Sequence, residues 1–354
     1  MKLDKTKEIH LPTGVLAIAG NSDASRLYVA CMDGKVFEVE PTGGAVSAFT
    51  ASHGSFASGC VLLPDGRTVI SGGYDGCLIW HDVESRQEVR RVKAHDFWSW
   101  RLACSPDGER VASVTGQYLV GGEKYEPAPA TEPAVKIFDA GSGDLLQTFT
   151  HIPPVLSAAF SADGRHFAAG NMMGEVRVWD VVGGDQVAQF TSPDFTSWGI
   201  IKSPHYCGGI YGLAFAPDGE SLLCCGMGPM TDPMAGNGKM TWQRWAWRQA
   251  PAKMLGQIRD GERGSGLMEA VVHQPDGGAF LMAGRQAQGT WNAAMFSAEG
   301  SLLASLDTKS RVTGGHFAAD GKVLYLGATT GQPKREADGK WPDYGRVYVV
   351  GLGA

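Results

Sequence analysis

A short turn centred on aspartate recurs seven times along the 354-residue chain, each time between two apolar stretches. Such turns between alternating apolar runs are a strong hairpin signal, because glycine reaches positive φ without a Cβ clash and aspartate bonds its own turn backbone. The repeat therefore predicts a fold built mainly from short antiparallel strands. The turns are Asn21-Ser22-Asp23, Pro64-Asp65-Gly66, Pro106-Asp107-Gly108, Ala162-Asp163-Gly164, Pro217-Asp218-Gly219, Pro275-Asp276-Gly277 and Ala319-Asp320-Gly321.

Each repeat contains four strand-like stretches, named here a, b, c and d in chain order. In the fourth repeat they cover residues 156–160, 166–170, 175–179 and 186–190. Their short length and their alternation favour strands over helices. Four-stranded units repeated radially predict an all-β, seven-bladed β-propeller in a single domain over residues 1–354. The expected blades cover residues 14–50, 53–95, 98–150, 155–192, 210–258, 268–307 and 312–350, the last together with 5–11.

The last repeat has only strands a, b and c before the chain reaches Ala354. Residues 7–11 resemble the d strands of the second and third repeats, so the N-terminal strand is predicted to complete the last blade. Such closure hides edge strands that would otherwise invite aggregation. The alternative is that residues 1–10 form a loose tail.

The ends of several repeats resemble those of WD-repeat proteins. Residues 170–180, which end in Trp179-Asp180, and residues 71–82 are similar to the end of a WD repeat, and residues 134–139 are a weaker version. With the turn at residues 105–108, the chain resembles a bacterial WD-repeat propeller over nearly its whole length. His81 stands where this family usually has tryptophan. The resemblance implies structural roles for His95, Trp179 and Asp180, beside those expected for the turn residues Asp65, Asp107, Asp163, Asp218, Asp276 and Asp320.

Composition disfavours several classes of function. Charged residues make up 19% of the chain and the formal net charge is −6, which offers no broad basic surface for nucleic acid. The N-terminus is charged where a signal peptide needs an apolar core, and no stretch approaches the ~20 apolar residues of a membrane helix. We therefore expect a soluble, cytoplasmic, monomeric propeller that neither enters a membrane nor binds nucleic acid.

The cysteines give no sign of a disulfide framework or a metal site. They are odd in number and lie mostly within apolar stretches, at positions 31, 60, 77, 104, 207, 224 and 225. No paired Cys/His spacing suited to zinc occurs, so we expect no metal and no cofactor.

The intervals between the Asp turns show where the chain has been lengthened. Successive aspartates are 42, 42, 56, 55, 58 and 44 residues apart, and the added residues lie in 116–133, 192–209, 226–239, 259–266 and 328–345. Each of these segments joins b to c or one blade to the next. In an antiparallel blade such connections emerge at the same end. We call that side the b–c face and predict that it carries function, because recognition on rigid scaffolds concentrates in loops.

Large aromatic residues in these connections suit a partner surface, because they offer much contact area at little cost in rotamer entropy. The alternative is that they fold back and pack the loops. The candidate partner-binding residues are Trp98, Trp100, Tyr118, Tyr125, Trp198, His205, Tyr206, Trp341 and Tyr344, and Phe195 is a further loop aromatic.

Motifs for catalysis have no clear counterpart in the chain. Residues 236–240 resemble a phosphate loop only in part, and neither a GxSxG elbow nor an HExxH site occurs. His95-Asp96 could form an acid/base pair, but the structural interpretation of His95 is preferred. We therefore predict no catalytic residue and a non-catalytic scaffold that binds a protein or peptide through the b–c face. The alternative is a propeller enzyme or small-molecule binder with its site at the mouth of the central channel on the same face.

Overall fold

The computed structural model describes residues 1–117, 120–121, 126–127, 131–198, 206–228, 240–258, 266–285, 290–331, 336–338 and 342–353. It is a seven-bladed β-propeller, and each of the first four blades is a four-stranded antiparallel sheet. Blade 1 contains β2 (Val15–Gly20), β3 (Leu27–Cys31), β4 (Lys35–Val39) and β5 (Val46–Ser52). Blade 2 contains β6 (Ala57–Leu62), β7 (Thr68–Gly73), β8 (Cys77–Asp82) and β9 (Glu88–Lys93).

Blades 3 and 4 follow the same order. Blade 3 contains β10 (Ser99–Cys104), β11 (Arg110–Thr115), β14 (Val135–Asp139) and β15 (Leu145–Phe149), and blade 4 contains β16 (Val155–Phe160), β17 (His166–Asn171), β18 (Glu175–Asp180) and β19 (Gln186–Thr191). A short hairpin of β12 (Val120–Gly121) and β13 (Glu126–Pro127) lies between β11 and β14 in the chain. The a, b, c and d stretches predicted for the fourth repeat agree with β16 to β19 within one residue at each end.

Blade 5 differs from the expected pattern. The segment 192–209 was expected to be a plain connection, but it contains a one-turn 3₁₀ helix η1 (Pro193–Phe195) and a strand β20 (Thr196–Trp198) that pairs with the start of β21 (Tyr206–Phe215). Phe195 is fully buried and anchors this segment in the core, so it is not a partner-facing aromatic. The remaining strands are β22 (Leu222–Met227), β23 (Met240–Ala246) and β24 (Lys253–Ile258).

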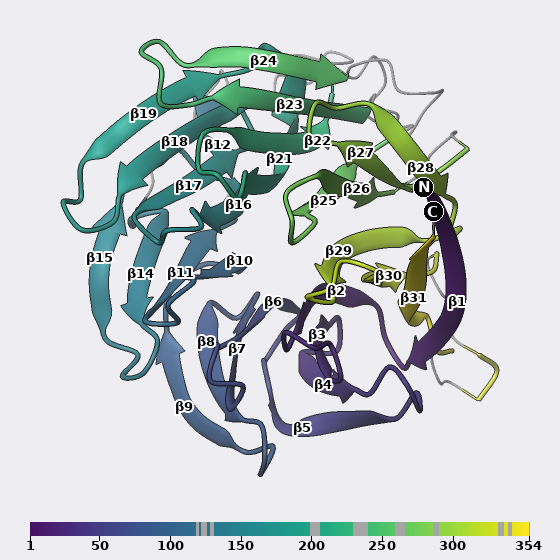
Figure 1. Cartoon of the computed structure of the whole chain (residues 1–354). Helices are drawn as coiled ribbons and strands as arrows, with labels where there is room; N and C mark the ends of the chain where they lie inside the picture. The colour runs from purple at the N-terminus through teal and green to yellow at the C-terminus, as the bar shows by residue number, and fades with distance from the viewer. Residues whose placement is uncertain are drawn as a thin grey trace.

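The last blade is closed by the N-terminal strand, as predicted. Blade 6 contains β25 (Met268–His273), β26 (Ala279–Gly284), β27 (Ala293–Ser297) and β28 (Leu302–Leu306), and blade 7 contains β29 (Arg311–Phe317), β30 (Val323–Thr329), β31 (Gly345–Gly353) and β1 (Lys2–Leu11). β1 pairs antiparallel with β31 from Lys2 opposite Gly353 to Leu11 opposite Gly345. The two chain ends therefore lie side by side (Figure 1).

The blades form a ring with their a strands at the centre and their d strands at the rim (Figure 1). Among the described residues, the buried apolar side chains form seven clusters, and each cluster joins two neighbouring blades. For example, Leu78 and Trp80 of blade 2 pack with Val111 and Phe138 of blade 3. The apolar core thus lies between the blades, and every blade depends on both neighbours to cover its faces.

The repeated turns share one hydrogen bond. In every turn an Asp carboxylate oxygen accepts a bond from the backbone N–H two residues later, as between Asp65 and the Arg67 N–H at 2.8 Å. The turn glycines have positive φ, such as +68° at Gly66. The equivalent bonds involve Asp23, Asp107, Asp163, Asp218, Asp276 and Asp320.

Candidate functional site

The a strand of every blade carries a β-bulge at the same place. In β10, Ser99 pairs with Thr115 and Arg101 pairs with Val114, so Trp100 between them has no partner on β11. The same register shift occurs in the other six a strands. A bulge changes the direction in which the neighbouring side chains point, and bulges are common beside functional sites.

The residue that follows the bulge lines a central cavity of about 180 Å³ in every blade. We call these positions the post-bulge ring, and they carry Ala17, Gly59, Arg101, Ser157, Gly212, Ala270 and Gly314. Six of these residues are small. Arg101 is the one long side chain of the ring and its one charged residue.

An ion pair lies at the same level of the channel. Glu269, the bulge residue of β25, is buried, and its carboxylate binds the guanidinium of Arg311 through two contacts of 2.5 and 2.7 Å. The Glu269 charge raises the pKa of Arg311. Burial lowers the pKa of Arg101, whose guanidinium makes one contact among the described residues, a 3.5 Å bond to the Leu16 carbonyl oxygen.

Four aromatic side chains adjoin this cluster, and we call them the aromatic ladder: Phe56, Tyr74, Trp98 and Trp100. The last three stack on one another, and the Phe56 ring is tilted against Tyr74 at 41°. The Tyr74 ring lies 4.4 Å from that of Trp98 at an interplanar angle of 9°, and 5.4 Å from that of Trp100. Phe56 lies 5.5 Å from Tyr74 and is 38% exposed. Burial raises the pKa of Tyr74 to about 12, against the opposing influence of Arg101.

Chain order places the aromatic ladder on the b–c face. Phe56 and Trp98 lie in blade-to-blade connections, Tyr74 lies in the b–c turn of blade 2, and Trp100 is the bulge residue of β10. Two of the candidate partner-binding residues, Trp98 and Trp100, are therefore brought together at the mouth of the channel. Both are half-buried, so each combines packing with an accessible face.

Of the other candidate aromatics, Tyr344 has a described side chain, and its contacts lie in blade 7 and the connection to blade 1. Tyr344 is half-buried; its hydroxyl lies 3.2 Å from Thr13 Oγ1, and its carbonyl oxygen accepts a bond from the Thr330 N–H. These contacts tie the b–c connection of blade 7 to blade 1. Trp198 and Tyr206 lie opposite each other on β20 and β21. Tyr118, Tyr125, His205 and Trp341 lie outside the described residues.

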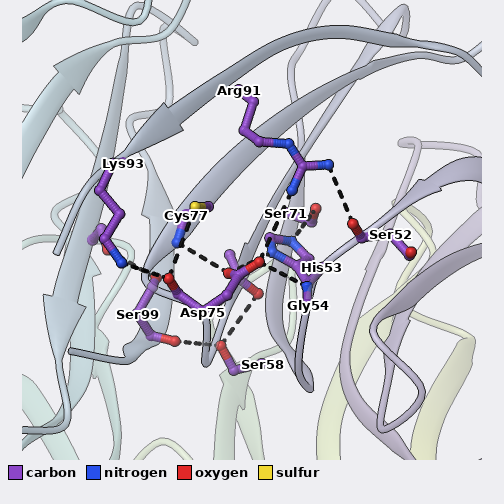
Figure 2. Close-up of polar contacts among 12 residues, drawn as sticks. Ser52, His53, Gly54, Ser58, Ser71, Asp75, Cys77, Arg91, Lys93 and Ser99 are labelled. Carbon is purple, nitrogen blue, oxygen red and sulfur yellow. Dashed lines mark hydrogen bonds and ion pairs between the residues drawn. The ribbon is translucent and has the colours of Figure 1, made fainter. Parts of the chain in front are cut away.

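A chain of hydrogen bonds stabilises blade 2 near this face (Figure 2). The Asp75 carboxylate lies 2.9 Å from His53 Nδ1, and His53 Nε2 lies 2.9 Å from the Ser71 hydroxyl. The same hydroxyl lies 2.8 Å from Nε2 of His81. Asp75 also accepts bonds from the backbone N–H groups of Gly54 and Cys77. The network joins the blade 1–2 connection to strands b and c of blade 2.

His95 occupies the equivalent place in blade 3. Its Nε2 lies 3.0 Å from the Ser113 hydroxyl, and its Nδ1 lies 3.5 Å from a Glu132 carboxylate oxygen. Burial opposes ionisation of Glu132, but hydrogen bonds with His95 and Lys136 lower its pKa to about 2. His95 thus faces Ser113 and Glu132, while the Asp96 side chain is exposed. This arrangement agrees with a structural interpretation of His95 better than with an acid/base pair.

Trp179 and Asp180 lie at the end of strand c in blade 4. Trp179 is 3% exposed and stacks on Phe149 of blade 3, with ring centroids 4.9 Å apart. Asp180 accepts bonds from the backbone N–H groups of Val182 and Gly183, which closes the c–d turn.

Three residues of the channel mouth were not singled out from the sequence. They are Arg101, Glu269 and Arg311, and Tyr74 of the aromatic ladder was missed as well. Alignment of the a strands at the bulge would have revealed Arg101, because the six equivalent positions are small. Glu269 stood out only as a charge within an apolar strand. Its pairing with Arg311 spans 42 positions and two blades.

The described residues contain no cluster of three or more His, Cys, Asp or Glu side chains placed to hold a metal ion. Six cysteines are free thiols, and four of these are buried; the six are Cys31, Cys60, Cys77, Cys104, Cys224 and Cys225. Over the described ranges, no helix has the length and apolar character needed to cross a membrane.

Comparison with known proteins finds similarity to WD-repeat proteins over part of the chain. Residues 143–180 match the family described as "WD domain, G-beta repeat". The chain is 26% identical over 218 residues to the U3 small nucleolar RNA-associated protein 4 homolog of Homo sapiens, an alignment that covers 60% of this chain and 29% of that protein. It is 28% identical over 147 residues to the small ribosomal subunit protein RACK1 of Candida albicans, covering 39% of this chain and 41% of that protein.

A solved structure supports the fold alone. The Kuenenia stuttgartiensis hydrazine synthase superposes with a TM-score of 0.71 over 91% of this chain and 95% of that chain, at 14% sequence identity. The two curated relatives named above are eukaryotic, so the bacterial character of the resemblance stays a prediction. The alignments also span less than half of those relatives' length. The chain thus contains a WD repeat at residues 143–180 within a seven-bladed β-propeller.

Proposed function

We propose that this propeller is a non-catalytic interaction scaffold that binds a protein or peptide partner through its b–c face. The observation that carries the proposal is the aromatic ladder at the channel mouth. In it, four rings from two blade-to-blade connections, one turn and one bulge pack together, three of them stacked. Partly exposed aromatic side chains held by mutual stacking are preorganised contacts, because little rotamer entropy remains to be lost on binding.

The face opposite the b–c face has a different character, and this difference supports the assignment. It carries the seven tight Asp turns and the c–d turns, whose polar groups are engaged in local hydrogen bonds, as at Asp180. Among the described residues, its most exposed large apolar residue is Val182 in the c–d turn of blade 4, which is 82% exposed. Val89 and Leu145, at the starts of d strands next to c–d turns, are exposed as well. Single exposed apolar residues are normal on protein surfaces and need no partner.

The proposal is tested by affinity purification from the native cell. Trp98→Ala and Phe56→Ser each remove part of the aromatic ladder, and Val182→Ala is the matched control on the opposite face. Loss of a central aromatic contact is expected to reduce partner recovery at least about tenfold, while the control recovers partners as the wild type does. Phe56 is the more exposed of the two, so Phe56→Ser separates lost binding from lost stability. Equal recovery with all three variants would exclude this surface.

Binding of a small molecule at the channel mouth is a second function, favoured by the charged groups gathered there. Arg101 and Glu269 line the cavity, and Arg311 pairs with Glu269. The polar side chains of Ser157, Tyr211 and Thr313 also line it. Among the described lining residues, the thiol of Cys60 is the obvious nucleophile, and burial raises its pKa to about 12. A thiol that stays protonated is a poor nucleophile. We therefore propose binding rather than catalysis at this position.

A further inference from the structure

The post-bulge ring gives the channel one positive charge, on Arg101, and within the described ranges no carboxylate forms an ion pair with it. Both carboxylate oxygens of Glu269 are taken up by Arg311, through the two contacts at 2.5 and 2.7 Å. Arg101 has up to five N–H donors, and among the described residues it makes one bond at the outer limit of hydrogen-bond length. Arg101 is half-buried and lines the cavity, so its remaining N–H donors can reach an anion bound there.

The side chains that line the cavity indicate which chemical groups an anionic ligand could carry besides its charge. Apolar side chains line it beside the charged group, namely Ile18, Leu102, Leu213, Val271 and Val272. The volume of about 180 Å³ is close to that of a cavity known to hold benzene, about 150 Å³. The space therefore suits a compact body of roughly the size of a benzene ring carrying one charged head.

We propose that Arg101 binds the carboxylate of a small organic monocarboxylate, with the apolar body of the ligand against the walls of the channel. The planar guanidinium matches a carboxylate in two parallel hydrogen bonds. A dianion such as phosphate fits less well, because Glu269 places a negative charge beside the site and only one positive charge is uncompensated. The proposal rests on small-molecule binding at the channel mouth and adds the class of ligand and the residue that recognises it.

Packing between neighbouring blades accounts for the small size of two ring members. A Cβ on Gly59 would lie 3.2 Å from Leu102 of blade 3, and a Cβ on Gly314 would lie 3.0 Å from Ile18 of blade 1. Close packing leaves these positions without room for a larger side chain. Arg101 is thus the one long, charged side chain that the ring contributes to the cavity.

The test is titration calorimetry of the full chain with benzoate, propionate, benzamide and inorganic phosphate. Wild type is expected to bind benzoate or propionate saturably, and to bind benzamide and phosphate at least tenfold more weakly. Arg101→Gln is expected to weaken carboxylate binding at least tenfold. Arg110→Gln, in the a–b turn region of blade 3 on the opposite face, is the matched control and is expected to bind as wild type.

Each outcome decides the proposal. Absence of carboxylate binding by wild type overturns it, as does unchanged binding by Arg101→Gln. Phosphate binding without carboxylate binding would overturn the ligand class while supporting a small-molecule site, which separates the two proposals. Should Arg101→Gln fail to fold, Arg101→Lys keeps the charge and removes the planar fork, and a carboxylate affinity equal to that of wild type would then contradict the assigned geometry.

Discussion

The imidazole of His81 lies 2.8 Å from the Ser71 hydroxyl, at the buried end of the hydrogen-bond chain that begins at Asp75. No polar group contacts Nδ1 of His81 among the described residues. Burial therefore lowers the pKa of this histidine to about 4, well below its ordinary value of 6.5. The folded state holds His81 neutral, and protonation opposes folding.

Stability should accordingly fall as the pH is lowered. Because the folded pKa of His81 is depressed, its contribution is complete above pH 6.5 and is lost progressively toward pH 4. The loss from this residue is expected to be about 2 kcal/mol between pH 7 and pH 5. His151 and His273, whose pKa values burial lowers to about 3 and about 4, act in the same direction.

Denaturant titrations at pH 7, 6 and 5 check this prediction. His81→Gln keeps a hydrogen-bonding amide without a titrating ring, so its stability should depend less on pH than that of wild type, even if it is lower at pH 7. His10→Gln is the control, since His10 is exposed on β1. An identical pH profile for wild type and His81→Gln would show that the residue does not carry the effect.

Two turn glycines with the same backbone conformation should differ in their tolerance of alanine. Gly66 and Gly76 have φ of +68° and +73°, which costs a residue with a Cβ about 1–2 kcal/mol. Nothing lies near the position of a Cβ at Gly66, whereas at Gly76 it would collide with the carbonyl oxygens of His95 and Phe97. Gly66→Ala is expected to cost only the conformational term, and Gly76→Ala clearly more. Similar unfolding free energies for the two variants would contradict this account.

Closure of blade 7 predicts that the N-terminal strand is structural. β1 buries Leu3, Ile9 and Leu11 against the neighbouring blades and pairs with β31 along its length. Deletion of residues 1–11 should expose the edge of β31 and lower the melting temperature markedly. Leu11→Ala alone should cost about 2–5 kcal/mol, the range for a fully buried leucine. An unchanged melting temperature after the deletion would mean that β1 adds nothing to the closed ring.

The blades could be predicted from the sequence because each Asp turn is stabilised by interactions between residues that are close in the sequence. The bond from Asp65 to the Arg67 N–H and the positive φ of Gly66 are complete within four residues, so their signal survives changes elsewhere. The extra strand β20 was not predicted, because three residues are too few for an alternation to be seen. Its position depends on the burial of Phe195, which is a tertiary effect.

The site was predictable only in part, since its residues come from different blades. Trp98 and Trp100 stand out as aromatics beyond the strand pattern, but the tight turn at Gly73-Tyr74-Asp75-Gly76 looks purely structural in the sequence. Stacking of Tyr74 on Trp98 joins two blades, and no local spacing encodes it. The role of Arg101 likewise emerges only when the seven bulges are placed around one axis.

Removal of the Glu269 carboxylate should lower the stability of the fold and at the same time strengthen anion binding in the channel. Glu269 is buried and its two oxygens engage Arg311, so Glu269→Gln breaks the pair. The Arg311 side chain that loses its partner is 38% exposed, so the unfolding free energy should fall by about 1–2 kcal/mol, less than for a fully buried pair. The same change frees a second guanidinium beside the channel and removes the negative charge that disfavours dianions. The affinity for benzoate should therefore rise severalfold, and the affinity for phosphate should rise by a larger factor.

Stability is measured by denaturant unfolding and ligand affinity by titration calorimetry, with Glu269→Gln/Arg311→Gln as the second variant. If the phosphate gain persists in that double variant, the freed Arg311 is not its source, and Arg101 alone would account for anion binding in the channel.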